Sequence, residues 1–393
     1  MTIEGRKHGK SKTGKVRLGM VGGGEGAFIG AVHRLAARMD DHYQFVAGAL
    51  SSTPDKAIKS AQALSLDKER SYSSFEAMAK AEAARADGIE AVSIVTPNHM
   101  HAPVATAFLK AGIHVICDKP LTATLKEAQD LQKLAAKSGK IFAVTYNYTG
   151  YPMVRHARQM VQNGDLGEIR VVQVEYPQDW LTERLESTGQ KQADWRTDPK
   201  RSGAGGCIGD IGTHAYNLAC FVSGLELEAL FADLTSFVKG RQLDDNAQVM
   251  LRFKGGARGM LWASQVAPGN ENNLRLRVYG TKGGLDWHQE QPNHLYWSPF
   301  GKPTQLISRG TAAANAAAAR VTRVPPGHPE GYLEGFANIY GEVAAAIIAA
   351  RQGRKPDKAV IYPSVIDGLQ GVAFVAAAVK SSAKGGAWVK LGT

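Results

Sequence analysis

Short apolar runs rich in valine and isoleucine alternate with amphipathic stretches along the first 146 residues. Runs that stay apolar at successive positions are typical of strands buried on both faces of a parallel sheet. The expected strands are 18–23, 45–50, 91–96, 114–118 and 141–146. The expected helices are 27–38, 55–64, 74–84, 101–111 and 124–137. This alternation predicts a doubly wound α/β domain with helices on both faces of its sheet.

The pattern changes after about residue 150. Helices are expected at 153–163, 211–223, 331–352 and 363–382, with a polar, irregular stretch before residue 210. Strands are expected at 170–180, 227–238, 246–253, 258–266, 273–280 and 284–288. Strands without intervening helices predict an α+β domain with a large, mostly antiparallel open sheet. The low-complexity run 311–319 forms either a helix or a loop.

A length of 393 residues favours two domains over one compact core. We expect a flexible tail at 1–14, a dinucleotide-binding domain at 15–149, and a substrate-binding and oligomerisation domain at 150–393. The formal net charge is +11, and the basic tail supplies much of it. The basic residues form neither a stripe nor a nucleic-acid-binding motif, so no nucleic-acid partner is expected.

Cellular location is inferred from what the sequence lacks. No apolar core or cleavage site follows the basic N-terminus, and no apolar run reaches the length of a membrane span. The three cysteines, Cys117, Cys207 and Cys220, have no metal-binding or disulfide-like spacing. We therefore expect a cytoplasmic protein with reduced thiols, no membrane association and no catalytic metal.

The first expected strand ends in a glycine-rich turn that opens a helix. Gly22-x-Gly24-x-x-Ala27 fits the G-x-G-x-x-G/A fingerprint of dinucleotide-binding Rossmann domains. Such a turn brings the backbone close to a pyrophosphate and aims a helix N-terminus at it. Gly26 and Phe28 complete this expected cofactor-binding turn.

The end of the second strand lacks the carboxylate that usually holds the ribose hydroxyls of NAD. Ser51 and Ser52 stand there instead, with Lys56 nearby. No negative charge would repel a 2′-phosphate, and the lysine would attract one. The cofactor is therefore NAD or NADP. Alternatively, the serines only begin the next turn and the backbone contacts the ribose.

Four motifs in order resemble the Gfo/Idh/MocA oxidoreductases, a family that includes inositol dehydrogenases and glucose–fructose oxidoreductase. The motifs are GMVGGGEGAFIGAVHR (19–34), VTPNHMHAPVA (95–105), CDKP (117–120) and GGCIGDIGTHAYNL (205–218). The third motif departs from the family's Glu-Lys-Pro by having Asp118. The segment DWRTDPKRSGAGG (194–206) is most similar to the sugar and cyclitol dehydrogenases.

The resemblance implies an NAD(P)-dependent dehydrogenase acting on a secondary hydroxyl of a sugar or cyclitol. Lys119, Asp210 and His214 are the expected catalytic residues. His214 is favoured as the proton acceptor and Lys119 as the group that polarises the oxygen, although a lysine base is an alternative. Without the family pattern, Asp210 could simply cap a helix and His214 could be structural. The bond between Lys119 and Pro120 is implied to be cis.

The other expected site residues fall into two groups. Beyond the glycine turn and the second strand, the cofactor-binding residues are Thr96, Pro97, Asn98, His101, Asp118 and Lys119. The substrate-binding residues are Lys119, Asn147, Tyr148, Trp180, Trp195, Arg196, Asp210, His214 and His328. Aromatic rings suit the C–H faces of sugars, although buried tryptophans more often belong to the core. His328 either closes over the site or lies in an exposed loop.

Two other readings of the sequence remain open. The protein could hold its cofactor tightly and carry out internal redox or sugar–sugar oxidoreduction. It could also be a non-catalytic regulator that binds a dinucleotide, although Lys119, Asp210 and His214 argue against this. A homodimer or homotetramer is expected, because an open antiparallel sheet presents a face that needs cover.

Overall fold

A computed structural model describes residues 14–392. The predicted tail at 1–14 lies almost entirely outside these residues. The first half is a five-stranded parallel sheet of order β2-β1-β3-β4-β5. Its strands are β1 (Val16–Gly22), β2 (Tyr43–Ala49), β3 (Ala91–Val95), β4 (His114–Cys117) and β5 (Phe142–Val144). The expected Rossmann-like doubly wound sheet is therefore confirmed.

Helices connect these strands where the amphipathic stretches predicted them. They are α1 (Phe28–Met39), α2 (Pro54–Ala63), α3 (Phe75–Ala84), α4 (His101–Lys110) and α5 (Leu125–Ser138). The chain order reverses between β1 and β3, which are neighbours in the sheet. In open parallel sheets, ligands bind beyond the carboxyl ends of the strands at such a switch point.

The second half is a mixed, mostly antiparallel sheet of nine strands, in the order β13-β12-β11-β10-β6-β9-β8-β7-β14. The strands that the sequence predicted are β6 (Ile169–Pro177), β7 (Leu227–Thr235), β8 (Asn246–Phe253), β9 (Arg258–Ser264), β10 (Arg275–Gly280) and β11 (Gly283–His288). Only β6 and β9 pair in parallel. The carboxyl ends of these two neighbouring strands therefore lie side by side.

Three strands were not predicted: β12 (His294–Pro299), β13 (Gln305–Ser308) and β14 (Val389–Lys390). Strands β13 and β14 are the two edge strands of the sheet, and β12 lies next to β13. Strands β12 and β13 each bury a single side chain, Leu295 and Ile307. With so little burial, their sequences carry hardly any alternation between apolar and polar residues.

The irregular stretch before residue 210 contains two short helices, α7 (Lys191–Arg196) and α8 (Pro199–Ser202). A helix of one or two turns has too few residues to show a hydrophobic period. The low-complexity run is part turn and part helix, because α10 (Ala316–Arg320) begins only after Asn315, whose side chain caps it. The helix expected at 211–223 begins earlier, with a π-helical turn η5 (Ile208–Gly212) that leads into α9 (Thr213–Ser223).

One face of the large sheet is covered by helices and the other is open. The covering helices are α6 (Pro152–Gln162), α9 and α12 (Val365–Ser382). Side chains alternate between buried and exposed along β8, as a half-buried strand requires. On the open face lies a groove of about 610 Å³, whose lining includes Met250, Met260 and Trp262.

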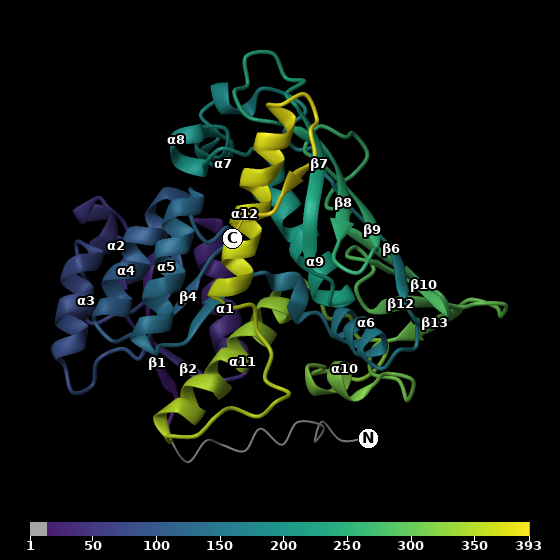
Figure 1. Cartoon of the computed structure of the whole chain (residues 1–393). Coiled ribbons are helices and arrows are strands. Elements are labelled where there is room, and N and C mark those ends of the chain that lie inside the picture. Colours follow the sequence, from purple (N-terminus) through teal and green to yellow (C-terminus); the bar gives the residue numbers. More distant parts are fainter. Residues whose placement is uncertain (1–13, 393) are drawn as a thin grey trace.

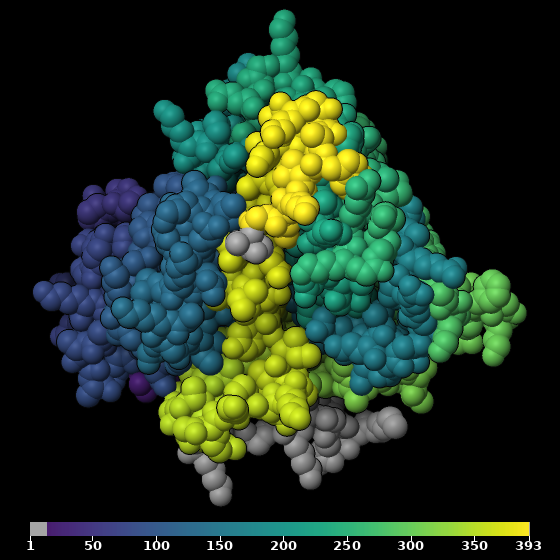
Figure 2. Space-filling view, viewed as in Figure 1, coloured from purple at the N-terminus to yellow at the C-terminus, as the bar shows by residue number. Residues whose placement is uncertain are grey.

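The last two helices connect the halves of the molecule. Figure 1 shows α11 (Tyr332–Arg351) and α12 between the N-terminal layers and the large sheet, and Figure 2 shows them as a yellow band between blue and green atoms. Helix α11 packs on α1, and its Phe336 and Tyr340 share a core with Val16 and Leu18 of β1. Helix α12 contacts both α5 and β7. The C-terminal helices thus bury the seam between the two halves.

By length and composition alone, α11 and α12 are apolar enough to cross a membrane. However, 67% of the apolar window of α11 and 50% of that of α12 are buried inside the protein. Both helices contribute side chains to the hydrophobic cores. Their apolar composition is accounted for by this packing.

Candidate active site

The glycine turn has the shape that a pyrophosphate needs. Gly22 and Gly23 have φ values of 80° and 71°, in the left-handed region that favours glycine. A Cβ atom at Gly24 would lie 2.6 Å from the carbonyl oxygen of Leu50, so the turn lies directly against the end of β2. The N-cap residue of α1, Ala27, provides no capping side chain. The first turn of α1 is therefore free to face an anion.

The close contact between helix and turn comes from Gly30 rather than from Ala27. A Cβ atom at Gly30 would lie 2.4 Å from the Cα atom of Gly23. The last small residue of the fingerprint is Ala27, but the residue that packs the helix against the turn is Gly30, three positions later. Gly26 and Phe28 remain exposed at the turn.

The end of β2 is occupied by a hydrogen-bonded turn. The Ser51 hydroxyl accepts a hydrogen bond from the Thr53 amide at 3.1 Å. Ser52 is exposed and Lys56 is half-buried on the first turn of α2. This turn leads directly into α2. The end of β2 carries no carboxylate from residues 49–54.

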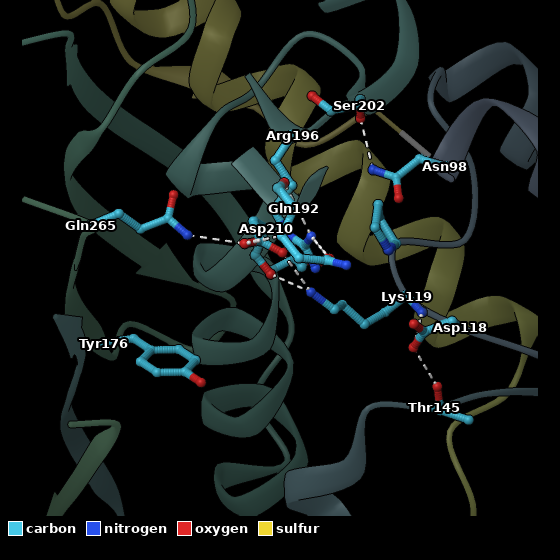
Figure 3. A network of polar contacts seen from close by, with 12 residues as sticks. Asn98, Asp118, Lys119, Thr145, Tyr176, Gln192, Arg196, Ser202, Asp210 and Gln265 are labelled. Atoms are coloured by element: carbon cyan, nitrogen blue, oxygen red, sulfur yellow. Dashed lines mark hydrogen bonds and ion pairs between the residues drawn. The ribbon is translucent and has the colours of Figure 1, made fainter. Parts of the chain in front are cut away.

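The turn after β3 lies beside the glycine turn. A Cβ atom at Gly22 would lie 3.0 Å from the Thr96 side chain. Asn98 is buried, and its amide donates to the Ser202 carbonyl of α8 at 2.9 Å (Figure 3). The ring nitrogens of His101 face the carbonyl oxygens of Pro120 and Thr96 at 2.8 and 2.9 Å. His101 thus connects this turn to the loop after β4, and Pro97 lies just before Asn98.

Asp118 holds the loop that follows β4. Its Oδ1 atom accepts from the Lys119 amide at 2.9 Å and from the Thr145 hydroxyl at 2.8 Å. The bond between Lys119 and Pro120 is cis, as the resemblance implied. His33 of α1 lies behind, with Nε2 3.9 Å from Asp118 Oδ1. This loop fixes the backbone from which the Lys119 side chain extends.

Lys119 and Asp210 meet across the two halves of the molecule. The Lys119 ammonium lies 2.9 Å from Asp210 Oδ1 and 2.7 Å from the Asp210 carbonyl oxygen. Arg196 Nε and Gln265 Nε2 donate to Asp210 Oδ2 at 3.2 and 2.9 Å (Figure 3). Burial by itself raises the pKa of Asp210, but the Lys119 and Arg196 cations outweigh it and hold that pKa well below its usual range. The carboxylate stays ionised.

The local sequence explains why Asp210 is in this position. Its side chain does not cap the helix, because both of its oxygens are used in the cleft. Instead, Asp244 accepts from the amides of Gly206 and Ile208 at 2.7 and 2.8 Å, at the start of the π-helical turn. A Cβ atom at Gly206 would lie 2.0 Å from the Asp244 carbonyl oxygen, so this approach requires glycine. π-Helical turns inside helices often occur at functional sites.

His214 lies one turn beyond Asp210 and is surrounded by three tyrosine rings. Tyr148, Tyr146 and Tyr176 have ring centroids 5.0, 5.8 and 6.4 Å from the His214 ring. Burial lowers the pKa of His214 well below 6.5, and the Lys119 cation lowers it further against the opposing effect of Asp210. The imidazole is therefore neutral near pH 7 and able to accept a proton.

A polar wall continues from Asp210 along the meeting ends of β6 and β9. Tyr176 donates to Asn272 Oδ1 at 2.8 Å, and Gln178 donates to the same oxygen at 2.6 Å. Tyr148 and Tyr176 form a short hydrogen bond between their hydroxyls. Gln178 Oε1 in turn accepts from Trp180 Nε1 at 3.1 Å. The wall offers amides and hydroxyls next to aromatic surface.

The remaining predicted substrate residues lie at different depths. Asn147 is buried, and its Nδ2 atom has no hydrogen-bond partner among residues 14–392. The Arg196 guanidinium stacks over the Trp195 ring at 4.3 Å. His328 is exposed in the loop before α11, where its carbonyl accepts from Arg309. Within the described residues, no contact joins His328 to the Lys119–Asp210 pair.

Several residues of this site were missed by sequence reasoning. They are Tyr176, Gln178, Gln192, Ser202, Gln265 and Asn272. Gln265 lies just past β9 and Gln178 just past β6, and their sequences carry no motif. Only the parallel pairing of β6 with β9 brings them together. Among residues 14–392, no group of three or more His, Cys, Asp or Glu side chains is arranged to hold a metal ion.

Both halves of the chain match models of one protein family. Residues 16–146 match the family model "Oxidoreductase family, NAD-binding Rossmann fold", and residues 154–286 match "GFO/IDH/MocA C-terminal domain". An oxidoreductase of known structure from Sinorhizobium meliloti is 60% identical, with a TM-score of 0.88, and the match covers 96% of this chain and 100% of that one. The chain belongs to the Gfo/Idh/MocA oxidoreductase family. The resemblance found in the sequence is confirmed.

Two further members of the family have named ligands or substrates. An inositol dehydrogenase homologue from Azotobacter vinelandii, complexed with NADH and myo-inositol, is 36% identical, with a TM-score of 0.89, over 96% of this chain and 97% of that one. The levoglucosan dehydrogenase of Pseudarthrobacter phenanthrenivorans is 28% identical over 95% of this chain and 97% of its own length. The protein is thus an oxidoreductase with an NAD-binding Rossmann domain, as predicted.

Proposed function

We propose that the protein is a dehydrogenase that oxidises a secondary hydroxyl of a sugar or cyclitol. The observation that carries the proposal is the Lys119 ammonium, held 2.9 Å from the Asp210 carboxylate, next to the buried and neutral His214. A cation and an uncharged proton acceptor side by side are what alcohol oxidation requires of the protein.

The cofactor fits the first half of the structure. Gly22, Gly23 and Gly24 leave no Cβ atom in the turn, and α1 presents an uncapped N-terminus to a pyrophosphate. Asp118 Oδ1 is used within the protein, and the other oxygen of this mostly buried side chain would be available to hold a ribose hydroxyl of the cofactor. When bound, the nicotinamide supplies the acceptor for the hydride that leaves the alcohol carbon.

The protein's own groups manage the proton. His214 takes the hydroxyl proton as the carbon loses its hydride, so that the alcohol becomes a carbonyl. Lys119 donates a hydrogen bond to the same oxygen and stabilises its developing negative charge. Asp210 keeps the Lys119 side chain in place. The ammonium held by this carboxylate favours His214 over Lys119 as the proton acceptor.

A polyol substrate suits the rest of the cleft. Arg196, Gln265, Gln178 and Asn272 offer several hydrogen-bonding groups, and Trp180 and Tyr148 offer aromatic surface nearby. Sugars and cyclitols combine hydroxyls with apolar C–H faces. The myo-inositol and levoglucosan of the two relatives are substrates of this kind, which supports the proposed class. A cytoplasmic location completes the proposal.

The test is a spectrophotometric screen at 340 nm of inositols, aldoses and anhydrosugars, each with NAD and with NADP. We expect reduction of at least one cofactor by a polyol. The second candidate, a tightly held cofactor that cycles between two sugars, predicts cofactor bound after purification and no net reduction in solution. Absence of any reaction with one polyol or with paired polyols would contradict both.

A further inference from the structure

The first turn of α11 reaches the proposed substrate site from the far end of the sequence. A Cβ atom at Gly335 would lie 2.7 Å from the Tyr151 ring and 3.0 Å from the Asn147 carbonyl oxygen. A Cβ atom at Gly150 would lie 2.0 Å from the Gly335 carbonyl oxygen. Here α11 lies backbone to backbone on the turn η3 (Asn147–Gly150), which carries Tyr148.

Tyr332 is the first residue of α11, and its ring is oriented by its neighbours. It packs edge-on against Phe336 at 5.2 Å, and Phe336 packs against His33 at 5.1 Å. His33 in turn faces Asp118. Glu334 accepts from the Gly331 amide at 2.8 Å, which fixes the start of the helix. Tyr332 is therefore linked to the Asp118 loop through Phe336 and His33, and its helix packs on the turn that carries Tyr148.

The electrostatics agree with this placement. Burial raises the pKa of Tyr332, and Tyr148 and the carboxylates of Asp118 and Asp210 raise it further, whereas Arg196 lowers it. These groups come from both halves of the molecule and all belong to the site. The Tyr332 hydroxyl thus lies within range of the charges that surround the cleft.

The hydroxyls of Tyr146 and Tyr340 are used within the protein, whereas that of Tyr332 is not. The Tyr151 hydroxyl also lacks a partner among residues 14–392, but that residue is fully buried. Tyr146 bonds to Thr213 at 2.9 Å, and Tyr340 bonds to Ser93 at 2.8 Å. Among residues 14–392, the Tyr332 hydroxyl has no hydrogen-bond partner, although most of its ring is enclosed. Buried phenols usually have such a partner, which leaves this one for a ligand.

We propose that Tyr332 is a substrate-binding residue that selects the polyol through a hydrogen bond from its hydroxyl. The inference rests on the proposed function. It adds a side chain from α11 to the substrate-binding groups supplied by the ends of β6 and β9. It also explains why α11 is joined so closely to the Tyr148 turn, because that contact sets the distance between substrate-binding groups on two separate segments.

The test compares Tyr332→Phe with the wild-type enzyme, using the preferred polyol from the screen. Phenylalanine keeps the ring contact with Phe336 and removes only the hydroxyl. Loss of one neutral hydrogen bond should raise the KM about three- to tenfold. The kcat should stay within about twofold and the NADH dissociation constant should not change. Tyr151→Phe is the matched control, since the Tyr151 hydroxyl is fully buried next to Tyr148.

Monodeoxy analogues of the same polyol identify the hydroxyl that is bound. The analogue that lacks this hydroxyl should react equally well with the wild-type and Tyr332→Phe enzymes, whereas the other analogues should still distinguish them. An unchanged KM in Tyr332→Phe, with an active wild-type enzyme, overturns the inference alone. No oxidation of any polyol by the wild-type enzyme overturns the proposed function, and this inference with it.

Discussion

At the scale of single residues, the site depends on compensation between buried charges. Asp210 is buried, yet two cations and the Gln265 amide keep it ionised. An isolated buried carboxylate would be protonated instead. The same Lys119 cation helps to keep His214 neutral. The Lys119–Asp210 ion pair thus keeps the Asp210 carboxylate ionised and helps to keep His214 neutral. Substitutions of Lys119 and His214 therefore test the proposed chemistry directly.

We predict that Lys119→Ala lowers the turnover number at least a hundredfold with little change in cofactor affinity, because the lost cation acts on the transition state. Steady-state kinetics and calorimetry measure the two effects. Lys126→Ala is the control, since Lys126 pairs with Asp130 on the exposed face of α5. A loss below about tenfold, with an unaltered melting temperature, would mean that Lys119 is not a catalytic residue.

His214 should determine the acid side of the pH–rate profile. Because burial lowers its pKa below 6.5, the histidine accepts a proton throughout the neutral range, and the rate should fall only at lower pH. His214→Asn should reduce turnover about a hundredfold or more and flatten this acid limb. Initial rates from pH 4.5 to 9 test this. An acid limb that persists unchanged in the variant would place the titrating base elsewhere.

His33 should make stability depend on pH. Burial lowers its pKa from 6.5 to about 4, so between these values the unfolded chain binds a proton that the native protein does not. Stability therefore rises with pH and is lost as pH falls from 6.5 towards 4. The difference between pH 7 and pH 4.5 should be about 2 kcal/mol smaller in His33→Gln.

Urea unfolding at the two pH values measures this difference. His328→Gln is the control, because that side chain is exposed and should leave the pH dependence unchanged. Equal pH dependence in His33→Gln and the wild-type protein would show that His33 is already protonated or accessible in the native state.

At the scale of elements, turns place the functional groups more than helices and strands do. The glycine turn after β1, the turn after β3 and the cis-Pro loop after β4 all lie at the carboxyl ends of the parallel strands. The π-helical turn before α9 carries Asp210, and Asp244 caps its start. Each turn is specified locally by glycine, proline or a capping carboxylate.

The turn after β2 should set the preference between cofactors. We predict that Ser51→Asp weakens NADP binding far more than NAD binding, because a new carboxylate would repel the 2′-phosphate. The aspartate can still accept the hydrogen bond from Thr53 that the serine accepts now. Ser65→Asp, at the exposed end of α2, controls for the added charge. Equal changes in both dissociation constants would show that the ribose is bound elsewhere.

At the scale of the whole molecule, the site exists only because the two halves meet. Lys119 comes from the first half and Asp210 from the second, and α11 and α12 fill the seam between them. Helix α12 packs on the sheet, whereas α11 packs on α1. The sheet keeps one face open.

We predict a homodimer or homotetramer assembled through this open face. Met250 and Met260 are 46% and 47% exposed there and line the groove, so a second subunit would remove their apolar surface from water. Replacing both by glutamate should give monomers by light scattering at micromolar concentration. Ile58→Glu, which alters an exposed apolar residue of α2, should not. A monomeric wild-type protein would contradict the prediction.

The sequence by itself determined most of the longer elements, the glycine turn and the order of the motifs. These features are local: a buried parallel strand must be apolar throughout, and a left-handed turn such as Gly22-Gly23 requires glycine. Motif order also singled out Lys119, Asp210 and His214 as candidate catalytic residues, which stays a prediction. Short strands such as β12 escaped prediction because they bury so little.

Only the tertiary structure decided which side chains share the cleft. Gln178 and Gln265 meet because β6 and β9 pair in parallel, and the first turn of α11 lies on the η3 turn that carries Tyr148. His328, by contrast, stays exposed in its loop. Contacts between segments that are distant in sequence depend on how the layers pack. They therefore produce no hydrophobic periodicity or motif spacing that sequence analysis could detect. The depressed pKa of His214 likewise follows from burial among three tyrosine rings, which no motif encodes.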